Sequence, residues 1–188
     1  MKKKAVAVVM TAVMALGMVS AVSVQAGIED KTLIVGFDAE YPPYGYMDEN
    51  GEYTGFDLEL AQAVCDLEGW ELEKKPINWD SKDMELNSGS IDCIWNGFTM
   101  NGREDDYTFS EPYVDNSQVI VVADDSGIEK LTDLAGKTVG VQAASAALDL
   151  LQSEEEGGQK ELADTFGALN EFADYNTAFT ELQAGALD

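Results

Sequence analysis

The sequence predicts an α/β protein with largely parallel β-sheets, divided into two lobes. Apolar, strand-like segments alternate with segments of helical periodicity along most of the 188 residues, an order typical of parallel sheets with crossover helices. A polar, proline-containing stretch, SEPYVDNSQ at residues 110–118, separates an aromatic-rich half from a plainer half. We interpret this change of composition as the crossing between the two lobes.

The expected elements follow from periodicity and from the residues that end each segment. Apolar side chains recur at helical spacing in residues 55–70, and Gly69 closes the pattern. A shorter helix should end at Gly89, and the ENG sequence at 49–51 predicts a hairpin turn. The segments expected to form helices are 55–70, 81–89, 144–153 and 176–184. The segments expected to form strands are 32–37, 70–77, 91–98, 118–124, 138–143 and 165–172.

Residues 1–26 have the pattern of a signal peptide. A basic MKKK start precedes a long apolar run, and small residues end at Ala26 where a signal peptidase would cleave. The alternative is a membrane anchor that is kept, since the apolar run is almost long enough to span a bilayer. No stop-transfer pattern follows it, so we expect the mature chain to begin near Gly27, outside the cytoplasm.

Charge and composition exclude several classes of function. The chain has 36 acidic and 11 basic residues, a formal net charge of -25, and no histidine. Such a surface repels phosphate backbones, so we expect no nucleic-acid partner, and it equally disfavours attachment to anionic lipid. The absence of histidine removes Ser-His-Asp and Cys-His catalysis and most zinc sites. We expect no metal, no cofactor and no catalytic residue.

Two cysteines, Cys65 and Cys93, leave their redox state open. Export from the cytoplasm permits a disulfide. Cys65 lies in a predicted helix and Cys93 in a predicted strand, so two free buried thiols are the alternative. Neither lies near the expected cleavage point, so no cysteine is available there for lipid attachment.

Three polar and aromatic stretches each follow a predicted strand. They are DAEYPPYGY from Asp38, NWDS around Trp79, and WNGFTMNGR at 95–103. Side chains at the carboxyl ends of strands in an open α/β sheet face the crevice where ligands bind. The sequence therefore predicts one pocket to which all three stretches contribute.

The side chains of these stretches suit a free amino acid. Asp38 accepts hydrogen bonds from an ammonium group, and rings such as Tyr41 offer a face to a cation or an apolar group. The Arg103 guanidinium binds a carboxylate through two parallel hydrogen bonds. The alternative is that the aromatic rings only pack in the core and that Arg103 pairs with Glu104 or Asp105.

Three longer segments carry a family resemblance. They are LIVGFDAEYPPYGYMDENGEYTGFDLELAQAV, FSEPYVDNSQVIVV and DLAGKTVGVQAAS. Together they resemble the extracytoplasmic solute-binding proteins of polar amino-acid ABC transporters, the type II two-lobed binding-protein family. The resemblance runs from about residue 31 to the end of the chain. It implies a type II periplasmic-binding-protein-like fold with a ligand cleft between the lobes.

The resemblance also implies a domain organisation and a function. Lobe one would span 27–112, a hinge crossing 113–117, and lobe two 118–188. The final LQAGALD resembles the start of a strand that completes lobe two, so we expect that lobe and the returning C-terminal segment to be incomplete. The expected function is to bind an amino acid outside the cytoplasm, in the periplasm or secreted, and to deliver it as a monomer to an ABC-transporter membrane permease, without enzymatic chemistry.

The residues that the resemblance places at the ligand differ in how well they match. GFTMNGR is one residue shorter than the usual family spacing, and the loop AASA lacks the usual glycine. Asn176 stands where an acid often binds the ammonium, so Asp174 or Asp38 would have to compensate. The expected ligand-binding residues are Asp38, Tyr41, Trp79, Gly97, Thr99, Arg103, Gln142, Ser145, Ala146 and Asn176.

Two other functions remain open from the sequence. The same fold hosts arogenate and prephenate dehydratases, although no acid is singled out here as a general acid. A sensory ligand-binding domain of a receptor is the other alternative. The sequence does not determine which amino acid is bound.

Overall fold

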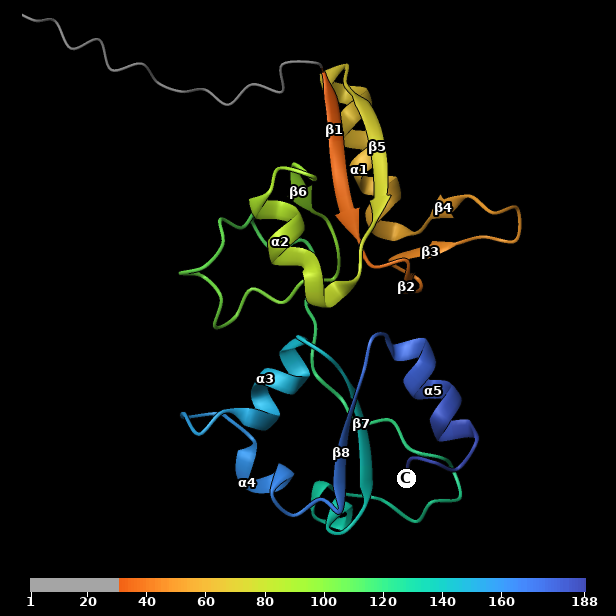
Figure 1. Cartoon of the computed structure of the whole chain (residues 1–188), viewed down its shortest axis with the longest axis vertical. Coiled ribbons are helices and arrows are strands. Elements are labelled where there is room, and N and C mark those ends of the chain that lie inside the picture. Colours follow the sequence, from red (N-terminus) through yellow and green to blue (C-terminus); the bar gives the residue numbers. More distant parts are fainter. Residues whose placement is uncertain (1–30) are drawn as a thin grey trace, which may run out of the picture.

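The computed structural model describes residues 31–188, so the predicted signal peptide at 1–26 lies outside the described residues. The elements form two groups stacked along the long axis of the molecule (Figure 1). We call the group with β1–β6, α1 and α2 the first lobe, and the group with β7, β8 and α3–α5 the second lobe. Between residues 31 and 188, no helix combines the length and the apolar character needed to cross a membrane.

The first lobe is built on a three-stranded parallel sheet in the order β5-β1-β6. Helix α1 packs on this sheet, with Leu58, Ala61 and Cys65 buried against Val35 and Phe37. A small antiparallel sheet, β2-β3-β4, extends from the carboxyl end of β1. The elements are β1 (Thr32–Phe37), β2 (Glu40–Tyr41), β3 (Gly45–Met47), β4 (Tyr53–Thr54), α1 (Phe56–Glu68), β5 (Glu71–Pro76), α2 (Lys82–Asn87) and β6 (Cys93–Ile94).

The second lobe has a two-stranded parallel sheet, β7 with β8. Helix α3 covers it through Leu148 and Leu151, which are buried with Val141. Helix α5 packs beside β7 (Figure 1). The elements are β7 (Thr138–Gln142), α3 (Ala146–Gln152), α4 (Lys160–Ala163), β8 (Ala168–Phe172) and α5 (Tyr175–Gln183).

The predicted α/β class and most predicted elements are confirmed. The four expected helices form at the expected places, and Gly69 ends α1 in the left-handed conformation, with its N–H bonded to the Cys65 carbonyl. The ENG turn joins β3 to β4, and Gly51 there has a φ of 84°. The short helix α4 at the end of the acidic loop was not predicted.

The strand predicted at 118–124 is wrong. This segment is extended but pairs with no strand among the described residues, and Val119 is 74% exposed. A strand needs a hydrogen-bonded neighbour, which an apolar run alone does not provide. Instead the segment forms one wall of an apolar groove whose other walls are β7 and α5. The strand predicted at 91–98 is shortened to Cys93–Ile94, which pair only with Val35 and Gly36.

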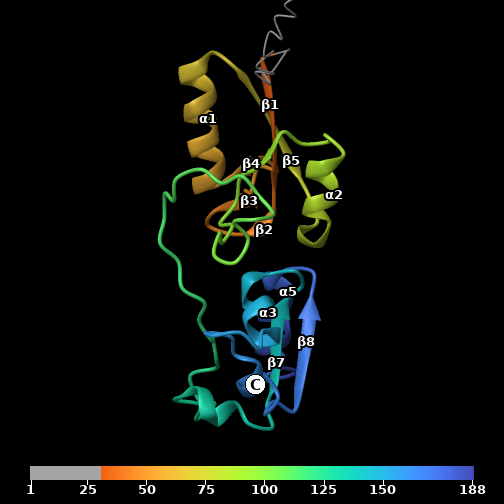
Figure 2. The same ribbon diagram turned by 90° about the vertical axis from the view of Figure 1, so that its left-hand side faces the viewer.

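The connection between the lobes runs along one side of the molecule (Figure 2). Residues 111–121 are all exposed. Tyr113 anchors this segment, since its hydroxyl donates to the buried Asp57 carboxylate at 2.7 Å. Burial raises the pKa of Asp57 above its usual value. The first residue of the hinge predicted at 113–117 is therefore fixed to the first lobe. The boundaries of the hinge stay a prediction.

The two cysteines are free in the structure. Cys65 is fully buried in the core of the first lobe, and Cys93 packs against the same core. Burial raises the pKa of the Cys93 thiol to about 11.

Gly55, which precedes α1, gives a test of this fold. It has a φ of 128°, and a Cβ atom there would lie 2.3 Å from the Tyr44 carbonyl oxygen. We expect Gly55→Ala to lower the free energy of unfolding by at least about 3 kcal/mol, because backbone strain and a backbone clash combine. Urea unfolding followed by circular dichroism measures this.

Gly51→Ala is the matched control. Gly51 also has a positive φ, but a Cβ atom there would meet nothing within 4 Å. Only the left-handed strain of about 1–2 kcal/mol should appear. Equal losses in the two variants would contradict the close approach of the hairpin to Gly55.

Candidate functional site

A pocket that is open to solvent lies where the two lobes meet. Both lobes and the connecting segment contribute to its lining. The lining residues are Tyr41, Trp79, Asn96, Gly97, Phe98, Thr99, Arg103, Asn116, Gln118, Gln142, Ser145, Ala146 and Tyr175.

Among the described residues that line this pocket, Arg103 is the only charged one. It lies on the loop after β6, and its guanidinium is stacked 5.1 Å from the centre of the Phe98 ring. Its side chain is 12% exposed. A guanidinium in a largely buried, aromatic setting interacts with an anion more strongly than it would in water. The site can therefore bind a carboxylate.

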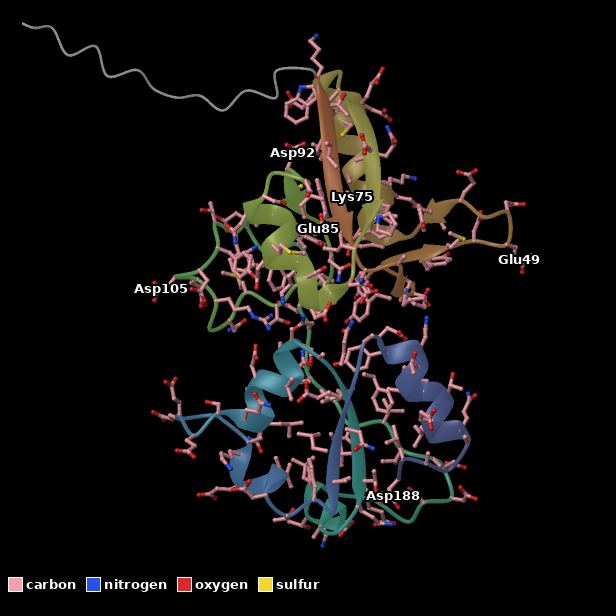
Figure 3. The ribbon with its side chains drawn as sticks, in the orientation of Figure 1. Glu49, Lys75, Glu85, Asp92, Asp105 and Asp188 are labelled. Carbon is pink, nitrogen blue, oxygen red and sulfur yellow. The ribbon has the colours of Figure 1, made fainter. Side chains whose placement is uncertain are left out.

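The partner of Arg103 within the chain was not the one considered from the sequence. Its salt bridge is with Asp149 of α3, at 2.6 Å, across the junction of the lobes. The side chain of Asp105 points outward at the tip of its loop (Figure 3). The alternative in which Arg103 pairs with Glu104 or Asp105 is therefore not found in the structure, although Arg103 does form an ion pair within the chain.

Aromatic rings form the walls of the pocket. Tyr41 stacks on Tyr44 with ring centres 5.7 Å apart and lies 6.3 Å from Tyr175 of the second lobe. Trp79 meets Phe98 edge to face at 5.2 Å. Such surfaces hold an apolar side chain or a cation equally well.

Gly97 allows this wall to form. A Cβ atom at this position would lie 3.0 Å from the Tyr41 ring, tighter than side chains normally pack. The glycine therefore lets the backbone after β6 lie directly against Tyr41 at the edge of the pocket.

Asp38 connects the two lobes rather than lining the pocket. It is 5% exposed, and its Oδ2 accepts a hydrogen bond of 2.7 Å from Nε2 of Gln142. Its Oδ1 accepts from the Glu40 N–H at 2.9 Å. Burial raises the pKa of Asp38, and the Glu40 N–H and Gln142 amide hydrogen bonds partly oppose this rise.

The two ends of the Gln142 amide group have different roles, since Nε2 bonds to protein groups and Oε1 is left for the pocket. Its Nε2 donates to Asp38 and, at 3.2 Å, to the Ala173 carbonyl. Both amide hydrogens are thus used, and Oε1 is the acceptor left for a ligand donor.

The loop after β7 brings Ser145 and Ala146 to the pocket. The Ser145 hydroxyl accepts a hydrogen bond from the Leu148 N–H and so caps α3. Ala144, just before it, has a φ of 53°, a conformation that glycine adopts more easily. In this loop, where the resemblance leads one to expect a glycine, the left-handed residue is an alanine.

Asn176 does not line the pocket. Its Nδ2 donates to Oε2 of Glu40 at 2.8 Å, another contact between the lobes. The neighbouring Asp174 caps α5 by accepting from the Thr177 N–H. The structure brings eight of the ten predicted residues together around one pocket, all except Asn176 and Asp38. The ligand-binding roles of all ten stay predictions.

Five lining residues were not predicted. Phe98 lies between two predicted residues, and Tyr175 lies next to one, so the motifs themselves point to both. Asn116 and Gln118 come from the connecting segment, where nothing in the sequence marks a pocket. The residues missed are Asn96, Phe98, Asn116, Gln118 and Tyr175.

Comparison with known proteins gives consistent results. The family described as bacterial extracellular solute-binding proteins, family 3, matches residues 33–188. The arginine-binding extracellular protein ArtP of Bacillus subtilis (strain 168) is 38% identical over 138 residues, which cover 73% of this chain and 51% of ArtP.

Solved structures agree with this result. A substrate-binding protein of an ABC uptake transporter from Streptococcus pneumoniae, with bound histidine, has a TM-score of 0.78 and 35% identity, over 84% of this chain and 64% of that chain. The ancestral amino-acid-binding protein AncCDT-1, a precursor of cyclohexadienyl dehydratase, has a TM-score of 0.76 and 32% identity, over 84% of this chain and 68% of that chain. The chain thus has a type II binding-protein fold, and it spans about half the length of ArtP and about two thirds of these structures.

The Asp38–Gln142 contact gives a pH-dependent prediction. Because the pKa of Asp38 in the folded protein is raised above 3.8, its contribution to stability is fully present below that value and is lost as the pH rises through the raised pKa. Gln142→Met removes a hydrogen-bond donor that favours the ionised form of Asp38, so the loss of stability with rising pH should be larger in this variant. We expect Gln142→Met to be destabilised by about 1–3 kcal/mol more at pH 7 than near pH 3.5.

Denaturant unfolding at several pH values measures this difference. Gln183→Met, at an exposed position of α5, is the control and should show the same pH dependence as the unaltered protein. A Gln142→Met difference that stays constant from pH 3.5 to 7 would show that Gln142 does not influence the ionisation of Asp38.

Proposed function

This chain belongs to family 3 of the bacterial extracellular solute-binding proteins, and on that basis we propose that it binds a free amino acid between its lobes and delivers it to the membrane permease of an ABC transporter. We place this binding outside the cytoplasm, consistent with the family and with the predicted signal peptide. By their names, two of the similar proteins bind arginine, in the case of ArtP, and histidine, in the case of the pneumococcal protein.

The observation that carries the proposal is the position of Arg103. The lining of the pocket contains this one cation and no carboxylate, and aromatic rings surround it. Hydrogen bonds from Arg103 to the α-carboxylate of a ligand would be charge-assisted, and the Thr99 hydroxyl lies on the same wall of the pocket. The Gly97 carbonyl and Oε1 of Gln142 are acceptors for the α-ammonium group.

Binding would proceed by closure of two lobes on the ligand. The first lobe provides Arg103, Trp79 and Tyr41, and the second lobe provides Gln142 and the loop of Ser145. Neither set alone surrounds a ligand, so binding favours the arrangement in which both contribute. The surface formed across the two lobes is what a permease would recognise.

A dehydratase function is less well supported by this pocket. A general acid would have to face the substrate, and none of the described residues that line the pocket is an acid. Two acids bond to lining residues and are thereby engaged: Asp38 with Gln142 and the Glu40 N–H, and Asp149 with Arg103. We therefore propose binding without chemistry.

Arg103→Ala tests the proposal. We expect it to weaken amino-acid binding at least 100-fold, since it removes the only charge that meets the α-carboxylate. Isothermal titration calorimetry with L-arginine, L-histidine, L-cystine and L-glutamine measures this. Lys130→Ala, which removes an exposed cation with a side chain 72% accessible, should leave binding unchanged.

Two results would contradict the proposal. One is the absence of binding of any of these amino acids to the unaltered protein. The other is an affinity that survives Arg103→Ala while circular dichroism shows that the variant is folded.

A further inference from the structure

The carboxylate-binding end of Arg103 is already engaged by the protein itself. Its Nη2 donates to Oδ2 of Asp149 at 2.6 Å and to the Ala144 carbonyl at 3.5 Å. Its Nη1 donates to the Thr99 carbonyl at 3.3 Å. Asp149 and Ala144 both belong to the second lobe, and Arg103 and Thr99 follow β6 of the first.

The geometry of a guanidinium makes Nη2 the critical nitrogen. A carboxylate binds in a bidentate manner either end-on, through Nη1 and Nη2, or side-on, through Nε and Nη2. Nη2 takes part in both arrangements. Nη2 carries two hydrogens, one for each arrangement, so a carboxylate that binds Arg103 through two hydrogen bonds must either share this nitrogen with Asp149, which places two carboxylates side by side, or replace Asp149 there.

A second buried cation lies beside this pair. Lys82 is 4% exposed, and its Nζ lies 3.4 Å from the Ala144 carbonyl and 5.2 Å from the centre of the Trp79 ring. Two cations of the first lobe thus converge on one carbonyl of the second lobe, next to Asp149. Burial lowers the pKa of Lys82, and the charges of Asp83 and, to a smaller extent, Asp149 oppose this. An anion near these two cations is therefore favourable.

Asp149 itself is free to leave. Its side chain is 59% exposed, in contrast to the 12% of Arg103, so solvent replaces its hydrogen bond when it swings away. It is not needed to begin α3, because Ser145 caps that helix. The cost of displacing it is therefore small, of the order found for partly exposed ion pairs.

We propose that Asp149 is an affinity-setting residue of the site: it competes with the carboxylate of the ligand for Nη2 of Arg103. This inference rests on the proposed function, since it requires that a ligand carboxylate binds Arg103. When the ligand is absent, the Asp149–Arg103 pair holds the lobes together. When a ligand carboxylate binds, it takes over the nitrogen, and part of its binding free energy is used to displace Asp149.

Asp149→Asn tests the competition, because it keeps the shape of the side chain and removes its charge. We expect the dissociation constant for the amino acid that binds best among L-arginine, L-histidine, L-cystine and L-glutamine to fall about 3- to 10-fold. Calorimetry measures the affinity, and stopped-flow fluorescence of the tryptophans should show faster association.

Asp164→Asn is the matched control. It changes the net charge of the second lobe equally, but Asp164 pairs with Lys160 on the surface of α4. Its affinity should stay within 2-fold of the unaltered protein, which separates local competition from a general change in charge. Asp149→Ala provides a second variant and should show the same direction as Asp149→Asn.

The outcomes separate the two proposals. Tighter binding in both Asp149 variants, but not in Asp164→Asn, supports the competition. Binding to the unaltered protein with equal or weaker affinity in the Asp149 variants overturns the competition and leaves the proposed function intact. The absence of binding of all four amino acids to every protein overturns the proposed function.

Discussion

The structure depends on one buried hydrogen bond between the lobes, from Gln142 to Asp38. Asp38 directly follows β1, the central strand of the first lobe's parallel sheet, and Gln142 is the last residue of β7 in the second lobe. The bond therefore joins the two sheets at the edge where parallel strands present their loops. A hydrogen bond to a charged group contributes about 1.5–3 kcal/mol, but burial of the carboxylate opposes this, as the raised pKa of Asp38 indicates. The two lobes are held in register by an interaction whose net contribution is modest, and this is compatible with their separating to admit a ligand.

The junction of the lobes holds two cations beside its acids, although the molecule as a whole is strongly acidic. The chain has a formal net charge of -25, yet the junction contains the buried Lys82 and the largely buried Arg103. Surface acids repel an approaching carboxylate, and two cations in a low-dielectric setting attract it over a short range. A zwitterion experiences little net repulsion at a distance and gains the local attraction once inside. The same electrostatics account for Asp149 reaching across the lobes, because any nearby carboxylate is drawn to these cations.

The sequence predicts the parts of the fold and site that depend on local pattern. The helix α1 follows from its periodicity and from Gly69, and the position of the pocket follows from the rule that polar residues after strands meet at one edge. The strand predicted at 118–124 fails because strand formation depends on a neighbour, and an apolar run does not reveal whether one exists. The roles of Asn116 and Gln118 could not be predicted either, since they depend on the path of the connecting segment across the pocket. Asp38 was expected at the ligand, and only the three-dimensional arrangement shows it bonded to Gln142, 104 residues away.

The partner of Arg103 shows why local reasoning is insufficient at the point that matters most for affinity. Two acids, Glu104 and Asp105, follow it directly in the sequence, but their loop directs Asp105 outward (Figure 3). Asp149, 46 residues away, reaches the guanidinium instead. A side chain that binds the carboxylate of a ligand well also binds carboxylates of its own protein well. The affinity of the site for its ligand depends on the difference between these two binding free energies. Asp149, an acid on the opposite lobe, therefore tunes binding without touching the ligand. Because it is exposed on α3, a substitution there changes how strongly it competes for Arg103 without changing the lining of the pocket.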